Sequence, residues 1–421
     1  MTARTIALWI ALIGSAARLS AQPCPGDCDI SGDVGFSEVA AAVQIGLDAT
    51  RFVSCTPADA DNDGVVNVED IVRNVDRAGG GCARQQQAFV VATDYETGSF
   101  AIVGLDAPRP VLPSSPSRRI GGDAVVRSHA GVLYVLNRRA NNIQAFDSRE
   151  ELTPLFQCST GSNTNPHDIA VVSPRKAYVT AYESTRLLIV NPSPQPDCGD
   201  FVSGAINLSE LADADGIPEM DQMVLVGDRL FVSLEQLDRR NLFAPARKGI
   251  LVEIDTEHDA VVGSIELSGA NPFASTKGLP VVNGDIVIAE AGRFGVNDGG
   301  IERVDLASLT ASGFFISEED LGGDVTDFVI LSAQLGYAAV SGDSSTKVVG
   351  FDPSQRRVLR TVYDRGGFVP DIEVNDRGEL FVSDRTFSRP GLRIYRAADG
   401  VELTTGVLPV GLPPFDLVFL P

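Results

Sequence analysis

The stretch that decides the fold is PHDIAVVSPRKAYVTAYESTRLLIVN, residues Pro166–Asn191. It contains three short runs rich in Val, Ile and Tyr, at Asp168–Val172, Ala177–Thr180 and Arg186–Val190, separated by turn-forming residues. Each run is too short for a helix and too β-branched for a loop, so each predicts a β-strand. The same pattern recurs about every forty to fifty residues from Ala88 onward. A repeat of that length predicts a β-propeller with one four-stranded blade per copy.

Counting the first, innermost strand of each copy gives seven blades. These strands are predicted at Asp123–Arg127, Asp168–Val172, Asp221–Val226, Gly278–Val282, Asp327–Leu331, Asp371–Val374 and Asp416–Leu420. The propeller begins in mid-blade, because Ala88–Thr93 and Ser99–Leu105 have the character of second and third strands. The missing strand is PPFDLVFLP, Pro413–Pro421, which is similar to PHDIAVVSP at 166–174. We therefore predict that the C-terminal strand completes the first blade and closes the ring.

Two segments point to a known group of propellers. IDTEHDAVVGSIEL at 254–267 and FDPSQRRVLRTV at 351–362 resemble the strand–turn–strand phrase of YVTN-type repeats, a seven-bladed group of secreted or periplasmic proteins. The resemblance covers about residues 88–421 and implies the fold. It implies no single activity, because members range from ligand scaffolds to lactonases.

Composition limits the partners of the protein. Its 421 residues are enough for two or three domains, and 34 basic against 56 acidic residues give a net charge of −22. This charge argues against nucleic acid or an anionic membrane surface as partner. Residues 1–21 have the features of a secretory signal, with Arg4 before an apolar run at Ile6–Ile13 and small residues around Ala21. We expect a secreted protein, extracellular or periplasmic, without a membrane span.

The segment after the signal contains two acidic loops of twelve residues. The first runs from Asp27 to Glu38, and the second, from Asp59 to Asp70, begins 32 residues further along. Oxygen ligands at positions 1, 3 and 5, glycine at 6, a backbone carbonyl at 7 and a carboxylate at 12 form the pattern that Ca²⁺ requires. The predicted ligands for two calcium ions are Asp27, Asp29, Ser31, Asp33 and Glu38, and Asp59, Asp61, Asp63, Val65 and Asp70. The alternative is a pair of Asp-rich turns without an ion.

Each loop precedes a predicted amphipathic helix, with apolar stripes at Val39, Ala42, Val43 and Leu47 and at Val68, Ile71, Val72 and Val75. Two loop–helix units in this arrangement resemble the dockerin module, a paired relative of the EF-hand. The resemblance covers residues 24–82 and implies cohesin as a partner. However, the loop positions where cohesin-binding dockerins carry Ser-Thr hold Phe36-Ser37 and Val68-Glu69. The resemblance therefore extends to calcium binding and not to the usual cohesin contacts.

An exported chain with six cysteines is expected to form disulfides. Four cysteines in the N-terminal module allow three pairings, of which we favour Cys24–Cys82 with Cys28–Cys55. Cys158 and Cys198 lie about one blade apart and are predicted to link neighbouring blades. The resulting domain organisation is a signal at 1–21, a calcium module at 22–82, a linker at 83–87 and a propeller at 88–421.

Catalytic motifs are scarce. The sequence has no Gly-x-Ser-x-Gly elbow, no paired-His zinc motif and no phosphate-binding glycine loop. Of three histidines only His167, beside Asp168, is expected near the channel, and a lone histidine is more commonly a turn or core residue than a base. No catalytic residue is predicted.

One pattern emerges when the blades are aligned, because six of the seven innermost strands begin with aspartate. These channel candidates are Asp123, Asp168, Asp221, Asp327, Asp371 and Asp416, with His167 nearby and Lys277 beside the exception, Gly278. In one interpretation each carboxylate accepts backbone N–H bonds that hold neighbouring blades together. In the other, the carboxylates converge on the axis and hold an additional cation or a basic group.

The connections on one face of the propeller complete the functional prediction. Two are long, at Leu234–Lys248 and Glu290–Gly299, and two are acidic, at Ser209–Glu219 and Ser317–Asp320. We expect a calcium-binding protein whose propeller binds a protein, peptide or carbohydrate without catalysis. One alternative is a lactonase or other hydrolase with its site at the channel mouth. Another is a cohesin-docking component of a polysaccharide-degrading assembly.

Overall fold

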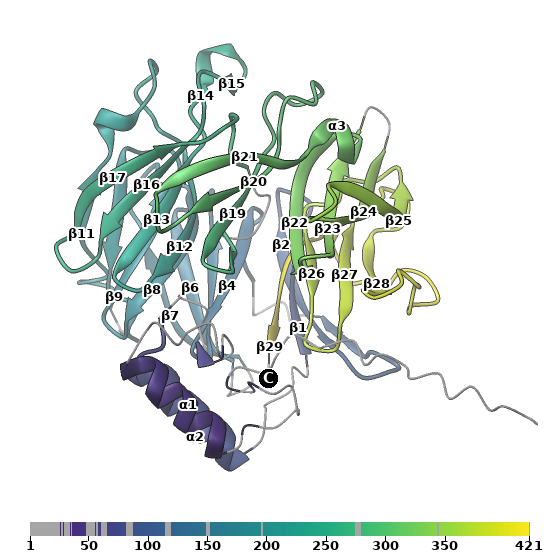
Figure 1. Cartoon of the computed structure of the whole chain (residues 1–421), viewed down its shortest axis with the longest axis horizontal. Coiled ribbons are helices and arrows are strands. Elements are labelled where there is room, and N and C mark those ends of the chain that lie inside the picture. Colours follow the sequence, from purple (N-terminus) through teal and green to yellow (C-terminus); the bar gives the residue numbers. More distant parts are fainter. Residues whose placement is uncertain are drawn as a thin grey trace, which may run out of the picture.

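The computed structural model of the chain describes residues 26, 28, 34, 36–47, 55, 58–59, 65–80, 87–113, 119–148, 152–194, 197–273, 279–342 and 345–420. Seven antiparallel sheets stand around one axis in the order of the sequence, as predicted for a seven-bladed β-propeller (Figure 1). Two helices, α1 (Phe36–Leu47) and α2 (Val68–Gly80), pack against each other below it. In the described part of the chain, no helix is long and apolar enough to cross a bilayer.

The first blade combines the two ends of the propeller sequence. From the axis outward it contains β29 (Pro414–Leu420), β1 (Gln87–Thr93), β2 (Gly98–Gly104) and β3 (Val111–Pro113). β29 pairs antiparallel with β1, with Leu417 opposite Val90 and Leu420 opposite Gln87. The structure therefore confirms the predicted closure of the ring by the C-terminal strand.

The next three blades follow in chain order. Blade 2 contains β4 (Ala124–His129), β5 (Val132–Asn137), β6 (Asn142–Asp147) and β7 (Thr153–Ser159). Blade 3 contains β8 (Pro166–Ser173), β9 (Lys176–Ala181), β10 (Arg186–Val190) and β11 (Val202–Asn207). Blade 4 contains β12 (Met220–Val226), β13 (Arg229–Leu234), β16 (Ile250–Asp255) and β17 (Ala260–Glu266), with a small inserted hairpin of β14 (Leu237–Asp238) and β15 (Ala244–Pro245).

The last three blades complete the ring. Blade 5 contains β18 (Val281–Val282), β19 (Asp285–Glu290), β20 (Gly300–Asp305) and β21 (Thr310–Ser317). The short helix α3 (Glu318–Leu321) leads into blade 6, which contains β22 (Asp324–Ser332), β23 (Leu335–Ser341), β24 (Thr346–Asp352) and β25 (Arg357–Arg365). Blade 7 contains β26 (Ile372–Val374), β27 (Glu379–Asp384) and β28 (Gly391–Arg396), and its outer edge is covered by bridges from Glu402 and Leu408.

Local chemistry explains why the strands turn where they do. Aspartates at the ends of third strands bond the backbone of the following turn. Asp255 accepts the amides of Glu257 and His258, and Asp352 accepts those of Ser354 and Gln355. Apolar side chains of neighbouring blades then pack into shared clusters. Ala88 and Val90 of blade 1, for example, join Phe381 and Ile394 of blade 7. Each blade is thus stabilised mainly by burial against the next.

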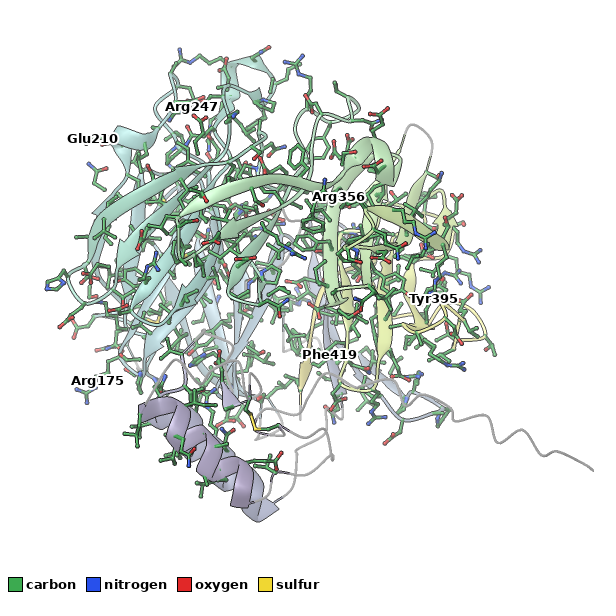
Figure 2. The ribbon with its side chains drawn as sticks, in the orientation of Figure 1. Arg175, Glu210, Arg247, Arg356, Tyr395 and Phe419 are labelled. Carbon is green, nitrogen blue, oxygen red and sulfur yellow. A yellow bond between two sulfur atoms is a disulfide. The ribbon has the colours of Figure 1, made fainter. Side chains whose placement is uncertain are left out.

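The propeller has two ends, which we call upper and lower. The upper face carries the connections from second to third strands and from one blade to the next, including the β14–β15 hairpin and α3 (Figure 1). The predicted long and acidic connections all lie there. Glu210 and Arg247 mark this face in Figure 2, whereas Arg175, in a turn between first and second strands, marks the lower face.

Candidate functional site

Three of the predicted aspartates at the innermost strands accept a backbone amide from the next blade. Asp416 accepts the amide of Val126 at 2.7 Å, Asp168 that of Met223 at 2.7 Å, and Asp327 that of Ile372 at 2.7 Å. Each amide belongs to the innermost strand of the following blade. At the junction of blades 5 and 6 the same role falls to Glu318, which accepts the amides of Gly299 at 2.8 Å and Val325 at 2.9 Å.

Arg127 ties this ring together at one level of the axis. Its Nε donates to Asp168 Oδ1 at 2.6 Å, Nη1 lies 3.4 Å from Asp416 Oδ2, and Nη2 donates to Gln222 Oε1 at 3.1 Å. One arginine of blade 2 therefore contacts blades 1, 3 and 4. Because all three partners are buried, the guanidinium is neutralised inside the protein.

The remaining channel candidates have different partners. Asp123 pairs with Arg138, Asp221 Oδ1 lies 2.9 Å from His167 Nδ1, and Ser383 Oγ donates to Asp371 Oδ2 at 3.5 Å. Lys277 lies outside the described residues. Among the described residues, no group of three or more His, Cys, Asp or Glu side chains has the arrangement of a metal site.

A second set of polar residues lies at the upper end of the axis, immediately after the second strand of four blades. These residues are Arg138 in blade 2, Tyr182 in blade 3, Glu235 in blade 4 and Arg385 in blade 7. Their amides donate to the carbonyls of Asp123, Asn165, Glu219 and Phe368, each shortly before the first strand of the same blade. The backbone position is therefore equivalent, whereas the side chain differs from blade to blade.

The carboxylate side of this upper end is a connected network. The ring of His167 stacks on that of Tyr182, with centroids 4.2 Å apart and planes at 10°. Tyr182 donates to Glu235 Oε2 at 2.7 Å. Asp221 Oδ2 is buried, and the Asp221 carboxylate acts electrostatically on that of Glu235.

Burial sets the protonation of this network. It raises the pKa of Glu235 well above its ordinary value, and the nearby Asp221 adds to the effect. Burial also lowers the pKa of His167, although its bond to Asp221 opposes that shift. Both shifts favour the uncharged forms of Glu235 and His167, and the contact of His167 Nδ1 with Asp221 places a proton on that nitrogen when the ring is neutral.

The other side of the upper end is cationic. The guanidinium carbons of Arg138 and Arg385 lie 5.2 and 5.7 Å from the ring centroid of Phe415. That of Arg385 also lies 4.6 Å from the ring centroid of Tyr95. Blades 7, 1, 2, 3 and 4 thus contribute neighbouring polar and aromatic side chains, with arginines at one end and acids at the other.

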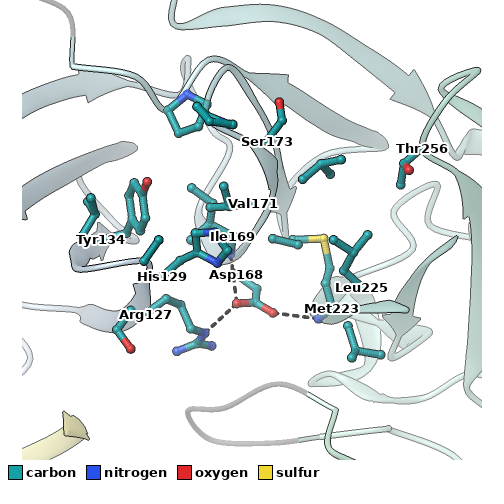
Figure 3. Close-up of a pocket in the computed structure, with 18 of the residues that line it drawn as sticks. Arg127, His129, Tyr134, Asp168, Ile169, Val171, Ser173, Met223, Leu225 and Thr256 are labelled. Atoms are coloured by element: carbon teal, nitrogen blue, oxygen red, sulfur yellow. Dashed lines mark hydrogen bonds and ion pairs between the residues drawn. The ribbon is translucent and has the colours of Figure 1, made fainter. Parts of the chain in front are cut away.

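The lower end of the axis contains a cavity of about 770 Å³ (Figure 3). Its lining is mainly apolar, from the innermost strands of blades 2, 3 and 4, with Arg127 and Asp168 among its polar groups. His129 and Tyr134 line it from blade 2, as Figure 3 shows. Val65, from the predicted second calcium loop, also contributes to the lining.

The structure describes only part of the predicted calcium module. Asp27, Asp29, Ser31, Asp33, Asp61 and Asp63 lie outside the described residues. Glu38, Asp59 and Asp70 are described, and their exposures are 6%, 4% and 0%. Glu38 accepts the amide of Cys28 at 2.6 Å, and Asp70 that of Asn67 at 2.9 Å.

Each helix of this module begins two residues before the end of the predicted loop, at Phe36 and Val68, and the predicted apolar stripes are largely exposed. Leu47 is 84% exposed and Val68 is 75% exposed, whereas Asn74 is buried and bonds the carbonyl of Ala58. The small core contains Ala42, Ile45 and the Cys28–Cys55 pair. Asn74 and the partly buried Ile71, which packs against that core, thus join α2 to the preceding segment.

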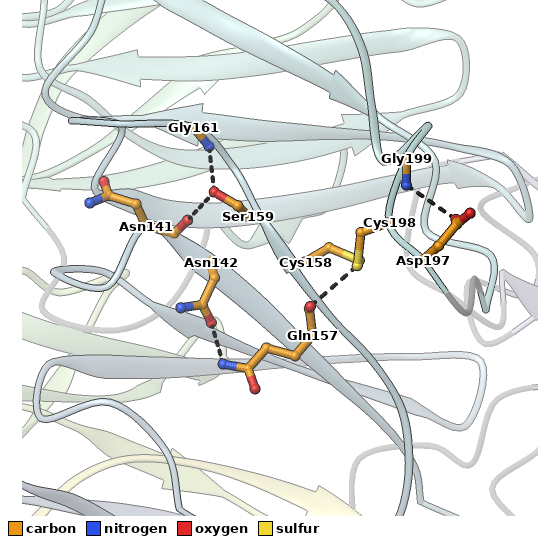
Figure 4. The surroundings of a disulfide bond; sticks show 9 residues. All are labelled: Asn141, Asn142, Gln157, Cys158, Ser159, Gly161, Asp197, Cys198 and Gly199. Atoms are coloured by element: carbon orange, nitrogen blue, oxygen red, sulfur yellow. Dashed lines mark hydrogen bonds between the residues drawn. A yellow bond between two sulfur atoms is a disulfide. The ribbon is translucent and has the colours of Figure 1, made fainter.

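Two predicted disulfides are confirmed. Cys28 bonds Cys55, and Cys158 on the outer strand of blade 2 bonds Cys198 in blade 3 (Figure 4). Cys24 and Cys82 lie outside the described residues, so their pairing stays a prediction.

Comparison with known proteins bears on the fold. No family model matches the sequence, and no curated protein does. Similar solved structures include a candidate 6-phosphogluconolactonase from Bacteroides fragilis (11% identity, 80% of this chain and 99% of that chain, TM-score 0.55). Dihydro-heme d1 dehydrogenase NirN in complex with DHE (16%, 79% and 74%, 0.51) and apo AztD from Citrobacter koseri (12%, 80% and 98%, 0.50) are also similar. The chain has the propeller fold of these proteins. At such identities the likeness shows the fold alone.

Sequence reasoning missed Arg138, Tyr182, Glu235 and Arg385. The signal was present, because aligning the blades at the residue after each second strand places these four at one position. The same residue repeated at this position in every blade would indicate a structural role common to all blades. Differing polar residues at an equivalent backbone site indicate a role that is not shared by every blade.

Proposed function

We propose that the protein is an exported binding protein whose propeller holds a small, largely apolar molecule in the lower cavity. The observation that carries this proposal is the cavity itself. Its volume of about 770 Å³ is within the range of small-molecule sites, and so is a lining of mainly apolar side chains with a few polar groups. The ion pair of Arg127 with Asp168 gives the polar part of that lining a fixed geometry.

The N-terminal module is proposed to bind two calcium ions and to stabilise this end of the chain. Its support is the donor set, ten oxygen-bearing positions in two aligned loops, together with the burial of Glu38, Asp59 and Asp70. Buried carboxylates require compensation, and a divalent cation supplies it. Export is supported by residues 1–21 and by the disulfides.

Binding of an apolar fluorescent probe, anilinonaphthalene sulfonate, to the folded chain tests the main proposal. We expect saturable binding that Val171→Trp abolishes, because Val171 lines the cavity and the larger ring fills it. Val202→Trp is the matched control, since Val202 is exposed on the outer strand of blade 3. Equal binding by both variants and the parent chain would place the probe elsewhere and refute the proposal.

A second candidate function, ester or lactone hydrolysis, is favoured by the His167–Asp221 pair. With Nδ1–H bonded to Asp221, Nε2 of His167 is left to accept a proton from water. The hydroxide attacks the lactone carbonyl, the ring C–O bond breaks, and the imidazolium returns its proton to the departing oxygen. Asp221 is the positioning residue.

Turnover of a lactone panel tests this candidate. His167→Asn is expected to lower the rate at least a hundredfold, whereas His258→Asn, on an exposed turn, leaves it unchanged. Because burial lowers the pKa of His167, the rate should stay constant down to a pH below 6.5. A chain that hydrolyses no lactone, or loses nothing in His167→Asn, would exclude this activity at His167.

A further inference from the structure

The upper end of the axis contains an arginine without a carboxylate. Among the described residues no Asp or Glu pairs with Arg385, although the residue before it, Asp384, is acidic. Asp384 is bonded instead to Arg393 Nε at 2.8 Å and to the Tyr363 hydroxyl at 2.8 Å. The buried arginines Arg127 and Arg393 each have carboxylate partners. Unlike these two arginines, Arg385 therefore has no carboxylate among the described residues that neutralises its charge through an ion pair.

The contacts of Arg385 fix its plane and leave one edge unused. Nη1 donates to the carbonyls of Pro413 and Pro414, both at 3.1 Å. The guanidinium lies against the rings of Tyr95 and Phe415. Nε and Nη2, the edge that binds a carboxylate or phosphate with two parallel hydrogen bonds, have no acceptor among the described residues.

Arg138 supplies a second, independent donor at the same ring. Its guanidinium carbon lies 5.2 Å from the centroid of Phe415, and its Nη2 is paired with Asp123. Its Nε is buried and has no hydrogen-bond partner within the described part of the chain. A buried donor without an acceptor is unfavourable, and an incoming anion would supply the missing acceptor.

We propose that Arg385 and Arg138 form a binding site for the oxyanion of a small molecule, a carboxylate or a phosphate, at the upper end of the axis. The half-buried position of Arg385 makes the site reachable from the upper face. Two arginines on one aromatic ring bind an anion more strongly than either alone, because partial burial weakens solvent screening. Tyr95 and Asp94 also act electrostatically on Arg385, and the Asp94 carboxylate accepts the amides of Glu96 and Thr97. The site is distinct from the lower cavity and does not rest on either proposed function.

Calorimetric titration of the full chain tests the site with three probes: sodium acetate, sodium succinate and inorganic phosphate, with sodium chloride at equal ionic strength as reference. We expect saturable binding of a carboxylate or phosphate beyond the chloride reference. Arg385→Gln should weaken it at least tenfold and Arg138→Gln by a similar factor. Arg389→Gln is the matched control, because Arg389 is exposed in the same connection, and its loss should stay below twofold.

Thermal denaturation separates binding from folding. The bound anion should raise the melting temperature of the parent chain and of Arg389→Gln, but not that of Arg385→Gln. Acetate or succinate without phosphate would identify a carboxylate site, and the reverse a phosphate site. The absence of saturable binding by all three probes, or an equal loss in Arg389→Gln, would overturn the proposal. Val171→Trp should leave anion binding unchanged, so failure of the cavity proposal is distinguishable from failure of this one.

Discussion

Removing the carboxylate of Asp168 should destabilise the propeller more than any exposed substitution. In Asp168→Ala the amide of Met223 loses its acceptor, which costs about 1–3 kcal/mol for a buried group. Arg127 Nε loses a charged hydrogen bond worth about 1.5–3 kcal/mol, although Gln222 and Asp416 still contact its other nitrogens. The expected loss is about 3–5 kcal/mol, the usual result of removing one partner from a buried ion pair.

Denaturation in guanidinium chloride measures this loss as a lower midpoint at an unchanged slope. Glu257→Ala, in an exposed turn, is the control and should change the free energy of unfolding by at most about 0.5 kcal/mol. The double variant with Arg127→Met should be less destabilised than the sum of the single variants, because it removes both partners of the Arg127–Asp168 ion pair together, although Asp416 still loses its contact with Arg127. A loss below about 1 kcal/mol in Asp168→Ala would show that this carboxylate does not hold blades 3 and 4 together.

Deleting residues 414–421 removes β29 and exposes the edge of β1, so we expect aggregation or a lower melting temperature. A monomeric chain with an unchanged melting temperature would contradict the claim that the pairing of β29 with β1 stabilises the propeller. Burial and the neighbouring Glu302 raise the pKa of Glu290 to about 10, above its unfolded value. The stability that Glu290 contributes is therefore complete in acid and is lost as the pH rises to about 10. Glu290→Gln should flatten the pH dependence of the free energy of unfolding by on the order of 1 kcal/mol per pH unit. An unchanged slope would argue against a protonated Glu290. Asp59→Ala should reduce calcium uptake of the full chain from two ions to one in calorimetry without changing the propeller's melting temperature, and uptake of two ions by the variant would remove Asp59 from the ligand set.

The sequence was most informative where a local pattern determines structure. Short β-branched runs bounded by turn residues predicted the innermost strands, for example Asp123–Arg127 against the observed β4 at Ala124–His129. The likeness between the last nine residues and an internal first strand predicted the closure. Both predictions rest on the repeat itself, in which each blade supplies the evidence for the others.

The candidate sites depend on contacts that no local pattern encodes. Arg138 and Arg385 are far apart in the sequence and meet only because the ring closes around Phe415. Glu318 joins blades 5 and 6 by accepting backbone amides from both, although its segment, Ser317–Asp320, was predicted only as an acidic surface connection. The lower cavity arises where three blades and residue Val65 adjoin, a volume that strand patterns cannot predict. The calcium-loop assignments remain predictions, because most of their ligands lie outside the described residues.

The pairing of Gln87 with Leu420 has a practical consequence for handling the protein. Both ends of the propeller chain reach the lower face, side by side, since β1 starts there and β29 ends there (Figure 1). A surface tether, affinity tag or fused domain attached after β29 is therefore carried on that face. Immobilised through its terminus, the molecule presents Arg385 and its neighbours to the surrounding solution and turns the apolar cavity toward the support.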